Sequence, residues 1–440
     1  MLKLNSLELK NYRGFAKLHL DFKTQLTCIA GINGAGKTSI LNALALCFSW
    51  IIARTKNPNG KGWSVNKQFD LHVDALQKTD LFSEVNEFVK KFTLEGYVGG
   101  AFSFFEKSIK IKHSFAAFGS KSETSSDYSS LSSIFDYVNS HVQINPEPFD
   151  LPVLVYYPTN RSVLDIPVRI KMQHSFDQFS AYENALEASA RFRDFFEWYR
   201  DREDIENAKK NELRNFDYKD PLLSAVRTAI YKCMVGYDNL HIQRTPQLML
   251  IRKNGVELPV NTLSDGEKCL FSMVGDLARR LSIAAPNLSD PLQGSGIVLI
   301  DEIDLHLHPS WQRKIVKQLK DTFPNCQFII TSHSPQVLGE LPASDIVVLN
   351  NGEVSTPKQT LGLTSNDILN NIMDYDENDI SMIRNENVAK LLSKLAAAVD
   401  DENFAQAKTI IDEIESITNG PIDETITYKA EIDMLSEESL

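Results

Sequence analysis

The chain of 440 residues is predicted to have an α/β fold with a mostly parallel sheet, antiparallel lead-in strands, a helical insertion and a helical C-terminal extension. Three observations predict this class. Two alternating apolar segments precede a continuous apolar run that ends in a glycine-rich loop. In the second half, apolar runs alternate with helical segments, which is typical of a parallel sheet covered on both faces. Apolar positions at helical spacing fill the middle and the end of the chain.

The lead-in strands are expected at residues 2–9 and 17–22, where apolar and polar side chains alternate. Residues 25–30 are apolar or small throughout and predict a buried strand. Residues 39–48 contain few helix breakers and predict a helix. The glycine-rich loop between them therefore has a strand before it and a helix after it.

The middle of the chain is expected to contain a loop at 54–62 and an exposed serine-rich insertion at 114–133, where nine serines fall. A strand is expected at 151–157 and helical structure at 175–216. Four aromatic side chains in that helical stretch recur at spacings of three and four, and we expect them to pack on a neighbouring helix: Phe192, Phe195, Phe196 and Tyr199. The charged run 200–204 is expected on the solvent side.

The second half begins with a predicted hairpin around Asn254-Gly255, with strands at 248–252 and 256–260. The alternation then continues with a helix at 266–284, a strand at 296–300, a helix at 309–322 and strands at 327–330 and 346–349. From residue 366 onward the chain is expected to be helical, with two amphipathic helices within 388–417.

The composition favours a globular protein in a reducing compartment. Hydrophobic content is 42% and the net charge is −12, a sign that disfavours nonspecific DNA binding unless a local basic groove exists. The five scattered cysteines are expected to be buried thiols. We expect no membrane span and no signal peptide, and therefore a cytoplasmic protein. The acidic tail, with six acidic residues in the last twenty, is expected to be solvated and partly disordered.

The loop Gly31–Thr38 matches G-x-x-x-x-G-K-[ST] at every fixed position. Its glycines let backbone N–H groups face phosphate oxygens, and the following helix N-terminus adds partial positive charge. Lys37 would reach the β- and γ-phosphates and Thr38 would hold Mg²⁺. The residues expected at the nucleotide are Asn33, Gly34, Ala35, Gly36, Lys37, Thr38 and Ser39.

Two further motifs contain hydroxyl or carboxylate groups. Ser264 and Glu267 have the spacing of a helix capping box, and the same helix end could also present Ser264 to a phosphate. The apolar run 297–300 ends in Asp301 and Glu302. Asp301 can bind Mg²⁺ through water, and Glu302 can act as general base on an attacking water.

Three histidines complete the candidate site. His306 and His308 form an H-x-H pair, which is weak evidence for a metal site. We expect that loop to touch a partner subunit near the nucleotide. His333 directly follows an apolar strand and precedes Ser334-Pro335, where it could contact a γ-phosphate and sense its loss.

Together these motifs resemble the ATP-binding-cassette superfamily in its SMC/Rad50/RecF-like and OLD-like branch, with the similarity carried by residues 1–50 and 260–350. The opening segment 7–15 is also similar. The resemblance implies that Lys37 and Thr38 bind ATP and Mg²⁺, that Asp301 binds magnesium, that Glu302 is the catalytic base and that His333 is a switch. It also implies a head-to-tail homodimer with two sandwiched ATP molecules.

In such a dimer Ser264 and Gly266 would face the ATP of the opposite subunit, and Arg13 would lie near the nucleotide. The implied organisation is an N-terminal lobe at 1–160, a helical insertion at 161–240, a C-terminal lobe at 241–360 and a helical extension at 361–440. The segment 264–268 corresponds to the signature motif of the family, and it departs from the family pattern because it reads Ser-Asp-Gly-Glu-Lys. In addition, His308 stands where transporters have an aspartate. Gln68 and Gln77 are candidates for the glutamine loop.

Several branches of the superfamily are disfavoured. The stretch 50–260 lacks the sustained heptads of an SMC or Rad50 coiled coil. Asp374 and Asp376 have the spacing of a Toprim metal pair, but no apolar strand ending in Glu-Gly precedes them. The chain is most similar to the PtuA-type ATPases of Septu and of retron-associated Septu-like systems, through segments 156–161, 195–199 and 300–309.

The PtuA resemblance implies an anti-phage ATPase that hydrolyses ATP and controls a partner HNH nuclease, PtuB. The altered signature could make this hydrolysis slow. In retron versions a reverse transcriptase and its RNA–DNA product join the complex. The choice between a Septu and a retron system stays open. Two alternatives also stay open: a RecF-like repair ATPase that binds DNA directly, and a nucleotide-locked scaffold with little turnover.

Overall fold

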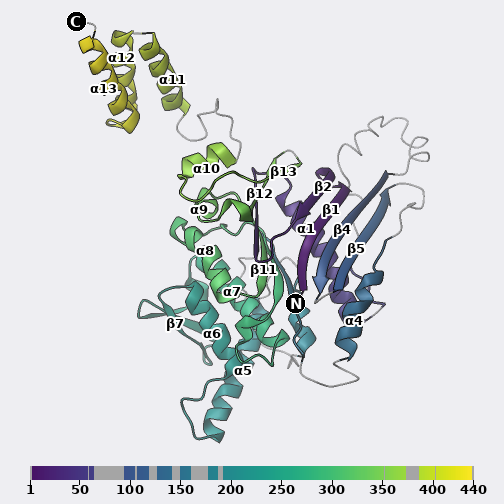
Figure 1. Cartoon of the computed structure of the whole chain (residues 1–440). Coiled ribbons are helices and arrows are strands. Elements are labelled where there is room, and N and C mark those ends of the chain that lie inside the picture. The colour runs from purple at the N-terminus through teal and green to yellow at the C-terminus, as the bar shows by residue number, and fades with distance from the viewer. Residues whose placement is uncertain are drawn as a thin grey trace, which may run out of the picture. The chain divides into compact units, whose positions relative to one another are not determined.

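The computed structural model contains two compact units, Met1–Leu363 and Thr364–Leu440, and each is described by itself. Figure 1 shows the course of the chain. The structure describes the following residues: 2–57, 59–63, 94–104, 107–117, 126–140, 149–159, 177–186, 192–350, 352–372, 386–401 and 403–438. Gln68, Gln77, Asp374 and Asp376 lie outside the described residues.

The central sheet of the first unit has the strand order β13-β12-β3-β11-β10-β6. Its neighbouring strands are parallel except for β12 and β13. The strands are β3 (Leu26–Ala30), β6 (Val153–Tyr157), β10 (Gly296–Ile300), β11 (Cys326–Ser332), β12 (Ile346–Asn350) and β13 (Glu353–Ser355). Every residue of β3, β6, β10 and β11 is buried, as expected for strands covered on both faces.

The register of this sheet brings the carboxyl ends of its strands to one edge. Ala30 pairs with Ser332, and Ile300 pairs with both Ile330 and Tyr157. The residues that follow β3, β10 and β11 therefore meet at the same edge, where ligands of open α/β sheets bind. The predicted mostly parallel sheet is confirmed.

A second, antiparallel sheet has the order β2-β1-β4-β5. It contains β1 (Leu2–Tyr12), β2 (Phe15–Asp21), β4 (Leu94–Phe104) and β5 (Lys107–Ala117). The two lead-in strands are confirmed: β1 continues past its predicted end, and β2 begins two residues earlier and ends one residue earlier than predicted. Strands β4 and β5 were not predicted, because the glycines of β4 and the lysines and serines of β5 obscure the alternation.

The first helix, α1 (Lys37–Lys56), runs past its predicted end, so residues 54–56 are helical and not part of a loop. Its stretch Lys37–Thr55 is long and apolar enough to cross a membrane by length and composition, and 61% of the tested window is buried inside the protein. The expectation that no such stretch exists was wrong on this criterion. The burial of α1 is typical of a core helix.

The serine-rich stretch 114–133, expected to be an exposed insertion, contains secondary structure and buried side chains where the structure describes it. Residues 114–117 end β5, and Ser129–Leu131 forms η1, which leads into α4 (Ser132–Asn139). Leu131, Ile134 and Val138 are buried. An apolar side at helical spacing, between the serines, anchors this segment.

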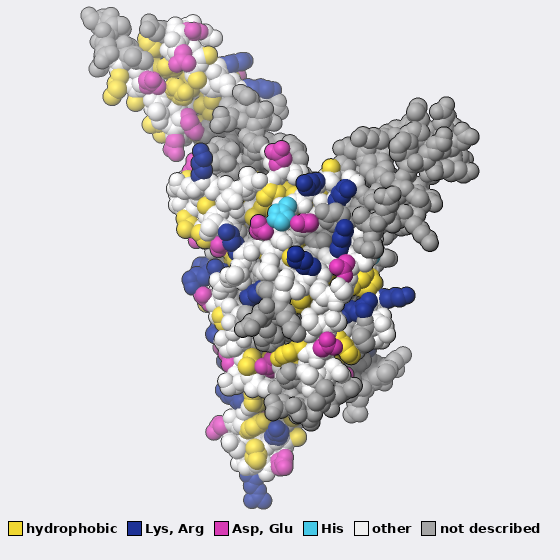
Figure 2. Space-filling view, turned by 45° about the vertical axis from the view of Figure 1, so that its right-hand side comes forward, with side chains coloured by type: hydrophobic (Ala, Val, Ile, Leu, Met, Phe, Trp, Pro, Cys, Tyr) yellow, Lys and Arg dark blue, Asp and Glu magenta, His cyan; other side chains and the backbone are white. Residues whose placement is uncertain are grey.

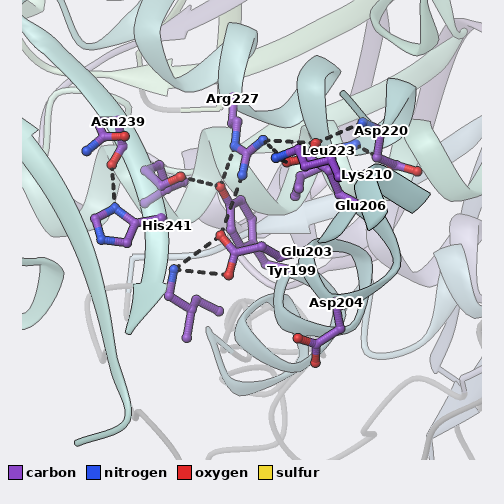
Figure 3. Close-up of polar contacts among 12 residues, drawn as sticks. Tyr199, Glu203, Asp204, Glu206, Lys210, Asp220, Leu223, Arg227, Asn239 and His241 are labelled. Atoms are coloured by element: carbon purple, nitrogen blue, oxygen red, sulfur yellow. Dashed lines mark hydrogen bonds and ion pairs between the residues drawn. The ribbon is translucent and has the colours of Figure 1, made fainter. Parts of the chain in front are cut away.

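The helical insertion contains η3 (Gln178–Tyr182), α5 (Phe192–Glu212) and α6 (Pro221–Cys233). The aromatic stripe packs on a helix as predicted, because Phe192 and Phe195 contact Phe271 of α7 (Asp265–Ala284). Within the charged run 200–204, however, Glu203 is only 6% exposed. Figure 3 shows that Glu203 points toward Arg227 of α6, so burial of this carboxylate is offset by a paired charge.

The remaining elements of the first unit surround the central sheet. A small antiparallel sheet contains β7 (Tyr237–Gln243), β8 (Leu248–Lys253) and β9 (Val256–Pro259), which confirms the hairpin and adds an unpredicted strand. The 3-10 turns of this half are η4 (Val260–Thr262), η5 (Pro291–Gln293) and η6 (Ala343–Asp345). The helices α8 (Pro309–Thr322) and α9 (Pro335–Leu338) follow β10 and β11. All five cysteines are buried free thiols, as expected.

The second unit is helical: α10 (Ser365–Ile372), α11 (Glu386–Asp400), α12 (Phe404–Thr418) and α13 (Asp423–Glu438). Leu395, Ile411, Ile414 and Ile432 are buried in one cluster, so α11 to α13 share an apolar core. The two predicted helices are confirmed. The acidic tail is helical over Asp423–Glu438, because Ile432 anchors it in that core.

Candidate nucleotide site

The phosphate loop connects β3 to α1 with three glycines at positive φ: Gly31 at 153°, Gly34 at 84° and Gly36 at 102°. Non-glycine residues seldom adopt the left-handed conformation of Gly34 and Gly36. Gly36 is the N-cap of α1 and supplies no side-chain cap, so the first N–H groups of the helix point into the loop. Asn33 and Gly34 are exposed, and Ala35 and Ser39 are half-buried.

The turn between β1 and β2 lies beside this loop. A Cβ atom on Gly36 would lie 2.6 Å from Cζ of Phe15, so the Phe15 ring fits only against a glycine. Arg13, two residues earlier, has a φ of 48°, and its guanidinium lies 5.6 Å from the ring centroid of Tyr12. The turn therefore brings Arg13 to the neighbourhood of the phosphate loop.

Lys37 is only 7% exposed, and its ammonium lies inside the loop. The Nζ atom donates to the carbonyl oxygens of Gly31, at 2.7 Å, and Ile32, at 2.9 Å. An ammonium has three donors, so two hold the loop and the third can reach a phosphate. Burial lowers the pKa of Lys37, and the nearby carboxylates of Glu302 and Asp301 oppose this effect.

Asp301 is buried at the end of β10 and is held by two hydroxyl groups. Thr38 Oγ1 donates to its Oδ2 at 2.8 Å, and Thr331 Oγ1 donates to its Oδ1 at 2.6 Å. The structure thus joins the end of the phosphate loop to the carboxylate of β10. A hydroxyl and a carboxylate oxygen at this edge are ligands that suit Mg²⁺, so the donor set fits that ion.

Glu302 is half-buried and has a φ of 47°, a conformation that is uncommon for a residue other than glycine. Its N–H donates to Thr331 Oγ1 at 2.7 Å, and Ile303 N–H donates to the Thr331 carbonyl at 3.0 Å. The turn after β10 is therefore fixed to β11. Such backbone strain often accompanies a functional position.

His333 is exposed at the end of β11, and its Nδ1 lies 3.4 Å from Asp304 Oδ2. Asp304 is buried and also accepts from Ser332 Oγ at 2.7 Å. Asp304 and Thr331 were not singled out from the sequence. Asp304 could have been noticed as a third carboxylate three residues after Asp301, and Thr331 as a hydroxyl at a strand end.

The signature helix α7 begins with the predicted capping box. Ser264 Oγ accepts from Glu267 N–H at 3.4 Å, and Glu267 Oε2 accepts from Ser264 N–H at 2.9 Å. Ser264 itself is exposed. Gly266 is buried against the loop after β10, where a Cβ atom on Gly266 would lie 2.2 Å from the carbonyl oxygen of His306.

Gly266→Ala is expected to lower the free energy of unfolding by about 1–3 kcal/mol, because the added methyl must push away backbone atoms. Gly14→Ala is the control, since a Cβ there meets nothing within 4 Å. Urea unfolding of both variants measures the difference. Equal stability of the two variants would contradict the close contact at His306.

A pH-dependent stabilisation is expected at Glu267. Burial alone would raise the pKa of its carboxyl, but bonds from Lys253, Tyr237 and Ser264 outweigh burial and lower the pKa to about 2. A carboxylate with a lowered pKa stabilises the fold above its unfolded pKa of about 4.3, and this contribution is lost as the pH falls toward 2. Glu267→Gln should therefore cost about 2 kcal/mol at pH 7 and distinctly less at pH 3.5, as measured by urea unfolding. A pH-independent difference would refute this prediction.

The H-x-H pair does not form a metal cluster in the described part of the chain, where no group of three or more His, Cys, Asp or Glu side chains could hold a metal ion. His308 is instead the N-cap of α8, and its side chain accepts from Ser310 N–H at 3.3 Å. His306 has a φ of 60°. This segment therefore starts α8 and packs against Gly266.

The sheet edge combines a phosphate loop, a carboxylate pair and a histidine from three adjacent parallel strands, and this combination places the chain in the class of ABC-type ATPases. A family model described as "AAA domain, putative AbiEii toxin, Type IV TA system" matches residues 26–339. The chain belongs to this family of ATPases.

Two retron-associated relatives match the chain over most of its length, and a Septu protein matches a shorter part. "Retron Ec83 probable ATPase" of Escherichia coli is 30% identical over 92% of this chain and 81% of the relative. "Retron Vc95 probable ATPase" of Vibrio cholerae is 29% identical over 90% of this chain and 84% of the relative. "Septu protein PtuA" of Bacillus mycoides is 41% identical over 21% of this chain and 12% of the relative. Among solved structures, the SMC head domain from Thermotoga maritima covers 80% of this chain and 98% of its own at 16% identity and a TM-score of 0.41.

Proposed function

We propose that this ATPase is the nucleotide-dependent subunit of a cytoplasmic anti-phage defence complex and that it controls a partner nuclease of the HNH type, PtuB. The observation that carries the proposal is the position of the site. All its residues lie within a chain that aligns over 92% of its length with a retron-associated ATPase. The similarity to Septu PtuA proteins supports the same role.

Each residue at the sheet edge has a separate role in ATP hydrolysis. Lys37 and the loop N–H groups would bind the phosphates, and Thr38 and Asp301 would hold Mg²⁺, which would neutralise phosphate charge. Glu302 accepts a proton from the attacking water, while its backbone bond to Thr331 keeps the carboxylate at a fixed point of the edge. His333, which Asp304 orients, contacts the γ-phosphate and senses its loss. Arg13 lies near the nucleotide.

Two copies of the chain would bind head to tail around two ATP molecules. In this arrangement the start of α7 supplies Ser264 to the nucleotide of the opposite subunit, and Gly266 keeps that helix end against the loop of Glu302. ATP would hold the dimer closed, and turnover would change the state of the nuclease. Light scattering of Glu302→Gln with ATP and Mg²⁺ tests the dimer, which should separate when the nucleotide is removed.

An affinity purification from the native host, with ATP and Mg²⁺ present, tests the partner. A small HNH protein identified by mass spectrometry supports the proposal, and a reverse transcriptase in the same sample indicates the retron version. Lys37→Ala is the control and should recover less of the nucleotide-dependent partner. Recovery of the wild-type chain alone, at every nucleotide condition, would refute the proposed complex.

A RecF-like function that includes direct DNA binding is the second candidate. "DNA replication and repair protein RecF" of Clostridioides difficile is 29% identical over 24% of this chain. On the face drawn in Figure 2, several Lys and Arg side chains lie around one histidine, and Asp and Glu side chains lie directly beside it, so this face is of mixed charge although the net charge is −12. ATP-dependent duplex binding that weakens steeply with salt would favour this candidate, and salt-insensitive or absent binding would count against it.

A further inference from the structure

A second group of buried polar and charged side chains connects the signature helix α7 to β6, away from the phosphate loop. Its members are Tyr157 at the end of β6 and three side chains in the second half of α7. Their exposed fractions are 1% for Tyr157, 2% for Asp276, 3% for Arg279 and 2% for Arg280. Fully buried charges persist only when they are paired, so the contacts within this cluster are closely specified.

Asp276 is the centre of the cluster. Its Oδ1 accepts from Arg279 at 2.7 Å, and its Oδ2 accepts from Arg280 Nε at 2.7 Å and from the Tyr157 hydroxyl at 3.0 Å. Burial would raise the pKa of Asp276, but Arg280 and Arg279 outweigh it and hold the pKa at about 2. The two arginines therefore neutralise the carboxylate, and the phenol adds a directed bond to the sheet.

Arg280 extends the cluster to the helical insertion. Its Nη1 donates to the carbonyl oxygens of Ala181, at 2.7 Å, and Glu183, at 2.9 Å. Tyr156 N–H donates to the carbonyl of Ala185 at 2.8 Å. The segment around η3 is thus bonded both to α7 and to β6.

Tyr157 also touches the nucleotide edge through its backbone. Its carbonyl oxygen accepts from the N–H of Asp301 at 2.8 Å, and Tyr157 pairs with Ile300 in the parallel register of β6 and β10. Tyr157 therefore bonds to the signature helix α7 through its side chain and to Asp301, directly after β10, through its main chain. The path from Asp276 to Asp301 passes through a single tyrosine.

We propose that Tyr157 is a positioning residue for ATP hydrolysis, which couples the location of the signature helix to the turn that bears Asp301 and Glu302. The inference rests on the proposed roles of those two carboxylates. When α7 docks on the opposite subunit's nucleotide, the phenol transmits that location to the end of β10. Its absence leaves the ATP-binding loop intact and misplaces the hydrolytic groups.

The test compares two buried tyrosines that each lose one hydroxyl. Tyr157→Phe removes the bond to Asp276 but keeps the ring and the backbone carbonyl. Tyr182→Phe is the matched control, because Tyr182 is 6% exposed and its hydroxyl donates to the carbonyl of Pro152 at 2.7 Å, outside the path to Asp301. Thermal unfolding, ATP affinity and single-turnover hydrolysis are measured for the wild type and both variants.

Tyr157→Phe is expected to lower the hydrolysis rate by about 10-fold or more, since a small misplacement of reacting groups is costly. ATP affinity should stay within about twofold, because misplaced hydrolytic groups leave the phosphate-binding loop unchanged. Tyr182→Phe should keep the wild-type rate with a similar shift in Tm. Equal rates for the two variants would overturn the proposal, and so would a loss of ATP affinity in Tyr157→Phe. A Glu302→Gln chain that stays monomeric would count against the sandwich dimer and against the docking of α7 on the opposite nucleotide. Unequal hydrolysis rates of the two tyrosine variants would still show that Tyr157 positions the turn after β10 within one chain.

Discussion

Glu302→Gln is expected to lower kcat for ATP hydrolysis by about 10²- to 10⁴-fold, which is the usual contribution of a positioned general base. ATP binding should be retained, since Lys37 and the phosphate loop are unchanged. The amide has nearly the same shape as the carboxylate but cannot accept the proton of the attacking water. Steady-state hydrolysis and equilibrium ATP binding measure the two quantities separately.

The matched control is Glu340→Gln. Glu340 is a half-exposed glutamate that pairs with Arg313 on the surface, so its replacement should leave kcat unchanged. If Glu302→Gln hydrolyses ATP at the wild-type rate, Glu302 is not the base. If ATP binding is lost together with hydrolysis, the residue acts in binding, and the role proposed for it fails.

Arg227→Met is expected to cause the largest loss of stability, roughly 3 kcal/mol, because it removes one partner of a buried ion-pair group. Arg227 Nη1 donates to Glu206 at 3.1 Å, and its Nε donates to Tyr199 Oη at 2.8 Å. The Glu203 and Glu206 side chains are only 8% and 3% exposed. Both would remain buried without their shared guanidinium, which Figure 3 shows between them.

Two nearby cations keep this loss at the lower end of the range for broken buried pairs. Lys210 lies 3.1 Å from Glu206, and Arg244 lies 3.2 Å from Glu203. Arg313→Met is the control, because the Arg313 and Glu340 side chains are 51% and 44% exposed and such surface pairs contribute about 0–1 kcal/mol. Urea unfolding at pH 7 compares the variants, and equal losses would show that the buried group does not stabilise α5 against α6.

The central sheet was predictable because its strands are short, continuously apolar and bounded by motifs that fix their ends. The phosphate loop and the carboxylates of Asp301 and Glu302 could be placed at one edge for the same reason: parallel strands carry their carboxyl ends together. Local patterns also determined the capping box of Ser264, whose two partners are three residues apart.

The features that were missed depend on contacts between distant segments. Glu203 looked like part of a solvated run, but its partners Arg227 and Ile242 come 24 and 39 residues later. Asp304 gains its role from Ser332 and His333, which belong to another strand and the residue after it. Periodicity describes one segment at a time, so it cannot reveal a pairing that only the assembled sheet and helices create.

The apolar character of α1 has a consequence for the synthesis of the chain. This helix packs against α4, β4 and β6, and the last of these ends at Tyr157, about 100 residues after α1 ends. At ribosomal rates of about 5–20 residues per second, α1 is synthesised roughly 5–20 seconds before the last of the segments that pack against it. During that interval the nascent chain exposes a segment that chaperones or the membrane-targeting machinery can bind, so the yield of folded protein depends on how quickly residues 94–157 follow.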